Sequence, residues 1–419
     1  MESQAEPQHH ELRVFGFSAE RGRIVFLLLG VLAMLCMGTV YSWSIFRKPL
    51  QELHGIQSTA SLLPFTVMLV MYAVCMPFAG AHMNRLGPGR MMALGALLIG
   101  TGYVLTGFAT STPTLVLCYG VLGGAGVGIA YGAPLAVSAA WFPDKKGLAM
   151  GLTMVGFGLS PLVTAPLAKF LMDQLGVQQT FWTLGGAFLC VLLLVSCFMR
   201  YPPPAWSPKS VLAVAASGSS LGRYPDNLLR TPVFHILCAC YTIGTFVGLS
   251  VIGISSSVAQ EVVRLPPETA AILVSLFAVF NGLGRPLFGW LADHRSPRFA
   301  AVLSFVLILS ASLTMLTVGE GNVIRYAISF CVFWMCLGGW LALAPTATLK
   351  LFDPARYAGN YGLVFTAYGV GALSGTLVTG VIRDLTGSYS MMFVPTAALA
   401  IVGMFLAARY LKPGDLDKG

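Results

Sequence analysis

The chain has 419 residues and a formal net charge of +9, and 56% of its residues are hydrophobic whereas only 10% are charged. Soluble domains carry about 25% charged residues, so this composition excludes an ordinary soluble enzyme or binding domain. It predicts a protein that crosses the membrane many times.

Residues 1–23 form a polar leader, and the apolar run behind it is too long for the core of a signal peptide. We therefore expect no cleaved signal peptide. Apolar segments of roughly 20 residues, long enough to cross about 30 Å of hydrocarbon, recur along the rest of the chain. They predict an all-α membrane protein with twelve transmembrane helices, near residues 24–46, 58–80, 90–110, 113–141, 147–172, 180–199, 232–258, 267–291, 299–318, 323–349, 359–382 and 389–411.

The basic residues are distributed unevenly between the two sides of this topology. The side of the N-terminus holds 18 of the 25 Lys and Arg residues, whereas the opposite side holds six and Arg285 lies inside a helix. Cytoplasmic loops carry such an excess, so we expect both termini in the cytoplasm, and the net charge needs no nucleic-acid partner. The six residues on the opposite side are Arg47, Lys48, Lys169, Arg264, Arg325 and Arg383.

The twelve predicted helices divide into two bundles of six. A polar, proline-rich segment separates them. The predicted parts are a cytoplasmic N-terminal tail at 1–23, an N-terminal bundle at 24–200, a cytoplasmic linker at 201–230, a C-terminal bundle at 231–411 and a tail at 412–419.

The two halves are an internal duplication. The segment MPFAGAHMNRLG aligns with RPLFGWLADHRS, and GLTMVGFG from Gly151 aligns with GLVFTAYG from Gly362. A carrier built from two similar bundles can rock them around a site that lies between them. The first match pairs Pro77 with Pro286, Gly80 with Gly289 and Asn84 with Asp293, each 209 positions apart, while Arg285 pairs with Met76.

Several motifs in order resemble those of a known family. They are YSWSIFRKPL, AAWFPDKKGLAMGL, RYPPPAW, RTPVF, NGLGRP and GNYGLVFTAYGVG. Together they resemble the bacterial oxalate:formate antiporter group and the monocarboxylate transporters, which belong to the major facilitator superfamily. The resemblance implies the major facilitator fold and a gating motif at Gly80, Asn84, Arg85, Gly289 and Asp293, where Asn84 replaces the usual acidic residue.

Arg285 is a permanent charge inside a predicted membrane helix, which is costly and marks a functional site. Asn281 lies one turn earlier on the same face, and Pro286 leaves the carbonyl of Gly282 without its helical donor. The planar guanidinium matches a carboxylate in bidentate geometry. An alternative is that Arg285 extends to the near interface or pairs with a loop acid such as Asp353. The resemblance implies that Arg285 binds the substrate carboxylate.

Charge counting then narrows the substrate. No Asp or Glu lies in the middle of a predicted helix, so a single buried cation favours a monoanion. In the resembled oxalate carrier a lysine provides a second cation, and Tyr368 takes its place here, while Leu337 and Leu341 replace two aromatic residues. We therefore expect a short monocarboxylate, such as lactate or pyruvate, in preference to oxalate.

The resemblance also implies aromatic residues around the substrate. Tyr41, Tyr131 and Phe365 match cavity positions of the group, and Trp340 could refill the volume lost at the two leucines. Tyrosine combines a hydroxyl with an apolar ring, which suits a short carboxylate. The alternative for each of these residues is a packing role.

Coupling leaves two alternatives open. Asn281 stands where animal monocarboxylate transporters carry an aspartate, so either anion exchange or proton symport through another group is possible. His235 is the candidate proton carrier, although it also fits a plain interface histidine. We expect a monomeric secondary transporter in a bacterial inner membrane, with a proton and a monocarboxylate as partners; a carboxylate exchanger and a non-transporting sensor are the alternatives.

The sequence predicts neither an enzyme nor a metal or cofactor site. All nine cysteines fall inside predicted helices, and none has metal-ligand spacing with histidines. The chain has no phosphate loop, no core acid and no paired catalytic histidines.

Overall fold

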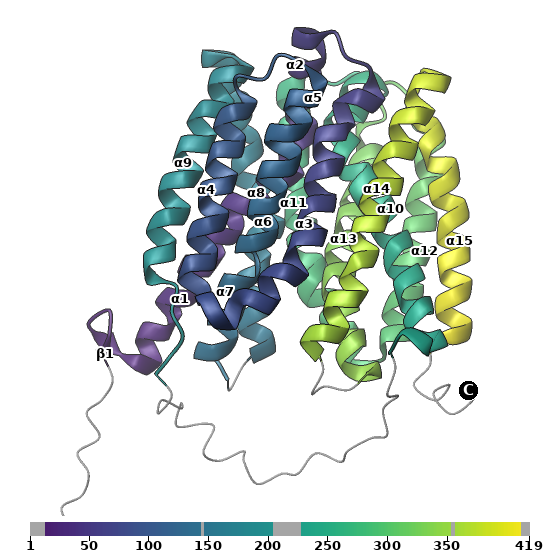
Figure 1. Cartoon of the computed structure of the whole chain (residues 1–419). Coiled ribbons are helices and arrows are strands. Elements are labelled where there is room, and N and C mark those ends of the chain that lie inside the picture. The colour runs from purple at the N-terminus through teal and green to yellow at the C-terminus, as the bar shows by residue number, and fades with distance from the viewer. Residues whose placement is uncertain (1–12, 144–145, 204–227, 353–356, 412–419) are drawn as a thin grey trace, which may run out of the picture.

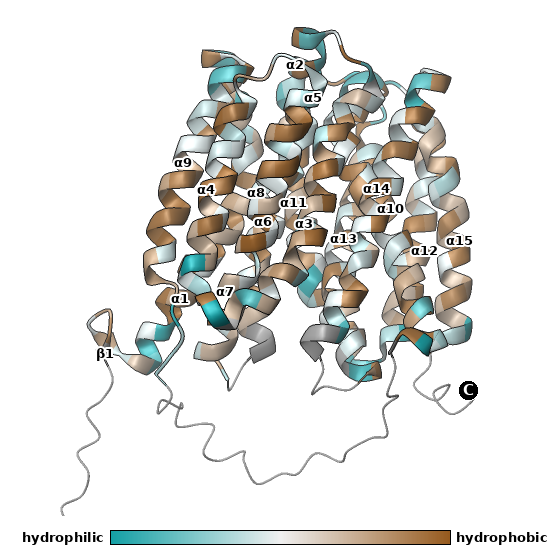
Figure 2. Ribbon diagram, viewed as in Figure 1, coloured by the Kyte–Doolittle hydropathy of each residue, from teal (hydrophilic) through white to brown (hydrophobic). Residues whose placement is uncertain are grey.

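The computed structural model describes residues 13–143, 146–203, 228–352 and 357–411. Within these residues, 12 helical segments are long and apolar enough to cross a membrane, which confirms the predicted number of spans. Residues along the middle of the helices are mostly apolar, and polar residues gather toward their two ends, as expected for a bundle surrounded by lipid (Figure 2).

The first six spans lie on one side of the molecule (Figure 1). A short hairpin precedes them, and the fourth span contains a π-helical turn, η2. The elements are β1 Arg13–Val14, β2 Phe17–Ser18, α1 Ala19–Met37, η1 Gly38–Ser42, α2 Trp43–His54, α3 Ser58–Leu86, α4 Pro88–Thr106, α5 Thr112–Leu115, η2 Val116–Gly123, α6 Gly124–Ala130, α7 Gly132–Trp141, α8 Lys146–Leu175 and α9 Val177–Phe198.

The other six spans form the second bundle (Figure 1). We call the side of the molecule where α9 ends and α10 begins the linker side, and the other the opposite side. The elements of this half are η4 Leu228–Arg230, α10 Pro232–Glu261, α11 Pro267–His294, α12 Pro297–Met315, α13 Val323–Leu351, α14 Tyr357–Thr386, η6 Ser390–Met392 and α15 Phe393–Tyr410.

The first span is longer than the predicted 24–46 and runs over Ala19–His54. It is interrupted by the 3-10 turn η1, where the chain passes very close to α8: a Cβ added to Gly38 would lie 2.3 Å from the carbonyl oxygen of Phe157. The following helix α2 has a polar composition that reads as a loop in the sequence. It nevertheless packs into the opposite side of the bundle and buries Arg47 there.

Two helix pairs join the halves, and the first is α3 with α14. On the opposite side, Thr59 contacts Gly380 closely and bonds to Asp384. Farther along the two helices, the hydroxyls of Thr66 and Thr376 are hydrogen-bonded. The two helices therefore run antiparallel and in contact over this half of their length.

The contact between α3 and α14 ends toward the linker side. A Cβ on Gly369 would lie 3.0 Å from the Cβ of Ala73. About two helical turns farther toward the linker side, Cβ atoms on Gly80 and Gly362 would meet nothing within 4 Å. The two helices have separated at that level.

The second pair, α8 with α11, behaves in the same way. Lys169 pairs with Glu268 at 3.3 Å on the opposite side, and Ser275 donates to the carbonyl of Pro161 at 3.2 Å. Farther toward the linker side Arg285 bonds to the carbonyl of Met154, and a Cβ on Gly151 beyond it would meet nothing within 4 Å. The molecule is thus closed on the opposite side and diverges on the linker side, and Arg285 lies where the closed part ends.

Candidate functional site

Arg285 lies about two thirds of the way along α11, at a point where α11 and α13 almost touch. A Cβ on Gly284 would lie 2.1 Å from the carbonyl oxygen of Met335, and one on Gly338 would lie 2.0 Å from that of Asn281. These close approaches fix α11 rigidly against α13. Arg285 itself is only 2% exposed, so it does not extend to the membrane surface, and Asp353 lies outside the described residues.

The guanidinium of Arg285 is only partly satisfied. Its Nη1 donates to the carbonyl of Met154 in the other half at 2.7 Å, and its Nη2 donates to Oδ1 of Asn281 at 3.5 Å. The Nε is buried and has no hydrogen-bond partner. Among the described residues Arg285 forms no ion pair, although a buried charge normally requires one.

The unsatisfied atoms of Arg285 share one edge of the planar group. Nε and Nη2 point to the same side, which is the edge that binds a carboxylate side-on, whereas Nη1 is anchored to Met154. Gly158 of α8 faces this edge: an added Cβ would lie 3.2 Å from Nε and 2.8 Å from Oδ1 of Asn281. The glycine therefore lets the backbone of α8 approach the donors closely, at a point where a side chain would not fit.

Asn281 is completely buried and held in a defined orientation. Its Nδ2 donates to the carbonyl of Trp334 at 3.0 Å, which leaves Oδ1 to face Arg285. The Trp334 ring is fixed in turn by a bond from its Nε1 to Ser255 at 3.1 Å. The amide oxygen thus faces the guanidinium across a long and weak hydrogen bond.

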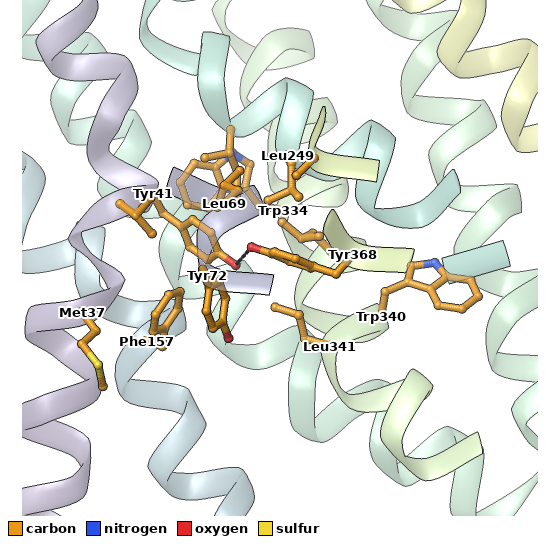
Figure 3. Packing of buried hydrophobic residues seen from close by; sticks show 14 of the residues in the cluster. Met37, Tyr41, Leu69, Tyr72, Phe157, Leu249, Trp334, Trp340, Leu341 and Tyr368 are labelled. Carbon is orange, nitrogen blue, oxygen red and sulfur yellow. Dashed lines mark hydrogen bonds between the residues drawn. The ribbon is translucent and has the colours of Figure 1, made fainter. Parts of the chain in front are cut away.

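Tyrosines from both halves meet in the interior of the molecule (Figure 3). Tyr41 packs against Phe157, whose ring lies 5.9 Å from the guanidinium carbon of Arg285. The hydroxyls of Tyr41 in η1 and Tyr368 in α14 lie 3.5 Å apart across the boundary between the halves. Phe365 stacks on Tyr368 with ring centroids 5.0 Å apart. The structure therefore brings together three of the predicted aromatic residues.

Tyr131 completes this cluster from the break between α6 and α7. The ring nitrogen of Pro134 cannot donate to the carbonyl of Ala130, which explains the break at this position. The Tyr131 ring lies 5.1 Å from that of Tyr72 and 5.4 Å from that of Phe157.

Tyr72, Phe157 and Trp334 belong to the site but are not among the predicted residues. Tyr72 contacts the rings of Tyr131, Phe157, Phe365 and Tyr368, and Phe157 lies 5.9 Å from the guanidinium carbon of Arg285. Two of them could have been predicted from the internal repeat, because they correspond to residues of the predicted site in the other half. At the offsets described above, Tyr72 corresponds to Asn281 and Phe157 corresponds to Tyr368.

Trp340 lies apart from this cluster. It is fully buried, stacks on Tyr241 at 6.2 Å and packs against Phe305 at 5.3 Å. Its ring points away from the Tyr41–Tyr368 pair (Figure 3). It fills space among α10, α12 and α13, and Trp334 is the tryptophan of α13 that contacts Tyr41.

The other predicted functional residues are found on the linker side. His235 is exposed at the start of α10, and its Nδ1 lies 3.1 Å from the carbonyl oxygen of Thr231. Asp293 pairs with Lys350 of the same half at 2.9 Å. Of the remaining gating residues, Gly80 and Gly289 lie in the diverging parts of their helices, Arg85 is exposed, and the side chain of Asn84 is outside the described part.

The sequence-based prediction of a single buried cation, Arg285, is wrong. It places Arg47 in a loop, but Arg47 is buried as well. Arg47 is 0% exposed. All three of its nitrogens donate hydrogen bonds: to Ser61 in the first half, and to the Gly253 carbonyl, Ser257 and Tyr389 in the second, at 2.9–3.3 Å. The burial of Arg47 cannot be recognised from the sequence, because α2 covers the end of the bundle and has the polar composition of a loop.

Comparison with known proteins agrees with this architecture. The oxalate:formate antiporter of Oxalobacter formigenes is 28% identical over 390 residues, which cover 92% of this chain and 90% of that protein. Monocarboxylate transporter 13 of Rattus norvegicus is 27% identical over 78% of this chain and 74% of its own length. For monocarboxylate transporter 12 of Homo sapiens the identity is 26%, over 77% of this chain and 67% of that protein.

A solved structure shares the fold. A bacterial homologue of the human lysosomal transporter Spinster, in an inward-facing and unoccupied conformation, matches with a TM-score of 0.70 and 16% identity, over 92% of this chain and 97% of that chain. A sequence profile of the Major Facilitator Superfamily matches residues 25–358 and 237–418. With its twelve spans in two bundles, the chain belongs to the major facilitator superfamily.

Proposed function

We propose that the protein is a secondary transporter of a short monocarboxylate, such as lactate or pyruvate. The observation that carries this proposal is Arg285, a buried charge without an ion pair among the described residues and with one donor edge unfilled. A substrate carboxylate would supply the missing charge and both acceptors. Tyr41, Tyr131, Phe365 and Tyr368 would bound its short carbon chain.

The charge of the site supports a monoanion. Arg47 adds a second buried cation, but its donors are already used, so the substrate meets one available guanidinium. Tyr368 brings a hydroxyl where a lysine would bring a second charge. A compact dianion would bury one charge without a partner in this site.

Alternating access would operate through the two crossing helix pairs. We infer that the linker side is cytoplasmic and that, in the arrangement closed at Arg47, the helices beyond the buried Arg285 diverge toward the cytoplasm. The protein would act as a monomer in the inner membrane of a bacterium, with Gly80, Asn84, Arg85, Gly289 and Asp293 in its cytoplasmic gate.

We propose proton-coupled symport as the mode of coupling, with His235 as a candidate proton carrier. Anion exchange is the second candidate, and the missing acid beside Arg285 favours it. An empty carrier would have to move an unneutralised arginine through its closed state, which is costly, so return would be slow without a second anion. The name of the oxalate:formate antiporter relative is consistent with that mode.

Uptake of labelled lactate into proteoliposomes distinguishes the two modes. For symport we expect accumulation driven by an inwardly directed proton gradient with no substrate inside. For exchange we expect uptake only into liposomes preloaded with a carboxylate, and no response to the gradient. A competition series across mono- and dicarboxylates at two pH values identifies the substrate class. Failure of every short monocarboxylate to compete or accumulate would reject the proposal.

A further inference from the structure

A second cluster of cations lies on the opposite side of the molecule, remote from Arg285. A cavity of about 270 Å³ is lined by Lys48 of α2, Arg264 behind α10 and Arg383 of α14, together with Glu261 and Tyr389. Drug-sized ligands occupy about 300–1,000 Å³, so this cavity suits only a small molecule or ion. It carries three positive charges and one negative charge.

Only one of the three positive charges of this cavity is neutralised from within it. Arg383 pairs with Glu261 through Nε and Nη2, at 3.0 and 2.8 Å. Lys48 and Arg264 make no ion pair or hydrogen bond in the part of the chain that the structure describes. Asp384, the neighbouring acid, is bound to Thr59 of α3. Two cations thus remain available to a ligand.

The backbone at Arg264 supports a defined position for one of these cations. Its φ angle is +65°, a left-handed conformation that is uncommon for residues other than glycine, asparagine and aspartate. The segment is fixed by hydrogen bonds from Leu265 to the carbonyl of Ala259 and from Gly321 to that of Val263. The turn therefore holds an arginine where a glycine would fit the backbone better.

Tyr389 connects this cavity to the contact that closes the opposite side. The guanidinium carbons of Arg383 and Arg47 lie 5.3 and 5.6 Å from the centre of its ring, so both cations stack against it. Its hydroxyl is bound to Nη2 of Arg47 at 2.9 Å. A ligand that shifts Arg383 or Tyr389 would therefore act on Arg47, which joins the two halves.

We propose that this cavity is a docking site for a small carboxylate anion, which is held by Lys48 and Arg264 before it enters from the opposite side or after it leaves there. The site concentrates the anion at the closed entrance, and competition with Glu261 for Arg383 loosens the contact at Tyr389. This inference rests on the proposed function, because it takes the same carboxylate as the transported substrate.

Transport kinetics from each side test the role of the docking site. The double variant Lys48→Gln/Arg264→Asn removes both available charges, and asparagine tolerates the left-handed conformation at Arg264. For lactate applied at the opposite side, we expect KM to rise roughly tenfold with the maximal rate unchanged, as lost charge focusing predicts. For lactate applied at the linker side, KM should stay the same. The matched control is Arg325→Gln, which removes an exposed cation on the same side outside the cavity.

The docking role would be overturned by an equal effect of Arg325→Gln, by an equal change of KM on both sides, or by an unchanged KM.

A binding measurement separates this result from the transport proposal. In purified Arg285→Lys protein, we expect acetate to slow acylation of Lys48 by an amine-reactive reagent, while Lys169 reacts as before. Equal protection by chloride at the same ionic strength would indicate charge screening alone and reject the site. Added anionic lipid, tested separately, would protect in place of acetate if the cavity holds a headgroup, which would also reject it.

Discussion

Two arginines are buried in this protein, and they differ in how completely their donors are used. Arg47 donates from all three of its nitrogens to oxygens of both halves. Arg285 has one short bond, one long bond and an Nε without a partner. Both are almost fully inaccessible, so burial alone does not tell a structural arginine from one that binds a ligand.

The difference in hydrogen bonding corresponds to a difference in place. Arg47 lies where the halves are in contact on the opposite side, so its bonds stabilise that closed arrangement. Arg285 lies at the end of the closed part, next to helices that diverge. An arginine whose donors are all hydrogen-bonded to the protein holds two surfaces together. An arginine with a donor left over can still gain a hydrogen bond from a ligand. Substitutions at the two positions should therefore affect transport in different ways.

The largest effect is expected at Arg285. Arg285→Lys keeps the charge but loses the planar fork, so we expect kcat/KM for lactate to fall by about two orders of magnitude, or ~3 kcal/mol. The protein should still reach the membrane in normal amount, which detergent extraction and size-exclusion chromatography would check. Uptake at the normal rate would contradict the assignment of Arg285 to substrate binding.

Removal of Arg47 should change the conformational equilibrium and spare the binding site. Arg47→Met keeps an unbranched side chain but removes the bonds between the halves. We expect the arrangement closed on the opposite side to lose about 2 kcal/mol relative to the alternative, or roughly 30-fold in population. Crosslinking between Thr66→Cys and Thr376→Cys, which are hydrogen-bonding neighbours in this arrangement, measures that population.

The control for Arg47→Met is Arg325→Met, an exposed position on the same side. It should leave crosslinking unchanged. If Arg47→Met crosslinked at the normal rate and instead lost lactate binding, Arg47 would belong with Arg285 as a substrate ligand, and the distinction between the two arginines would fail.

The fold and the presence of a buried charge at Arg285 were predictable, because a chain that crosses hydrocarbon must consist of long apolar helices in which a charge stands out. Twelve apolar segments and a charge inside one of them can be recognised without a structure. The role of Arg47 could not be predicted, because its partners come from α3, α10 and the segment before η6, and only tertiary packing brings these together. The sequence predicts Trp340 in the site from side-chain volume alone, yet the direction of its ring depends on the rotation of α13.

A second cation beside Arg285 would test the charge argument directly. Tyr368→Lys places an amine next to Tyr41, at the position where the sequence comparison expects a lysine in an oxalate carrier. We expect inhibition of lactate uptake by oxalate to strengthen by roughly tenfold relative to inhibition by pyruvate, since a charge pair near 4 Å is worth at least ~1 kcal/mol. Tyr368→Phe is the control, because it removes the hydroxyl and adds no charge. Unchanged competition by oxalate would show that charge does not set the selectivity.

The smallest expected effect concerns the close approach of Gly158 to Arg285, and it has a matched control on the same helix. In Gly158→Ala the added methyl group lies 3.2 Å from Nε of Arg285 and 2.8 Å from Oδ1 of Asn281, so it occupies the edge that the carboxylate needs. We expect KM for lactate to rise about fivefold, or ~1 kcal/mol, as for a modest overpacking. In Gly151→Ala the methyl group meets nothing within 4 Å, and KM should not change. Equal KM values for the two variants would mean that the carboxylate approaches Arg285 from another direction, through Nη1 and past Met154, and that the unsatisfied Nε is not the atom that receives it.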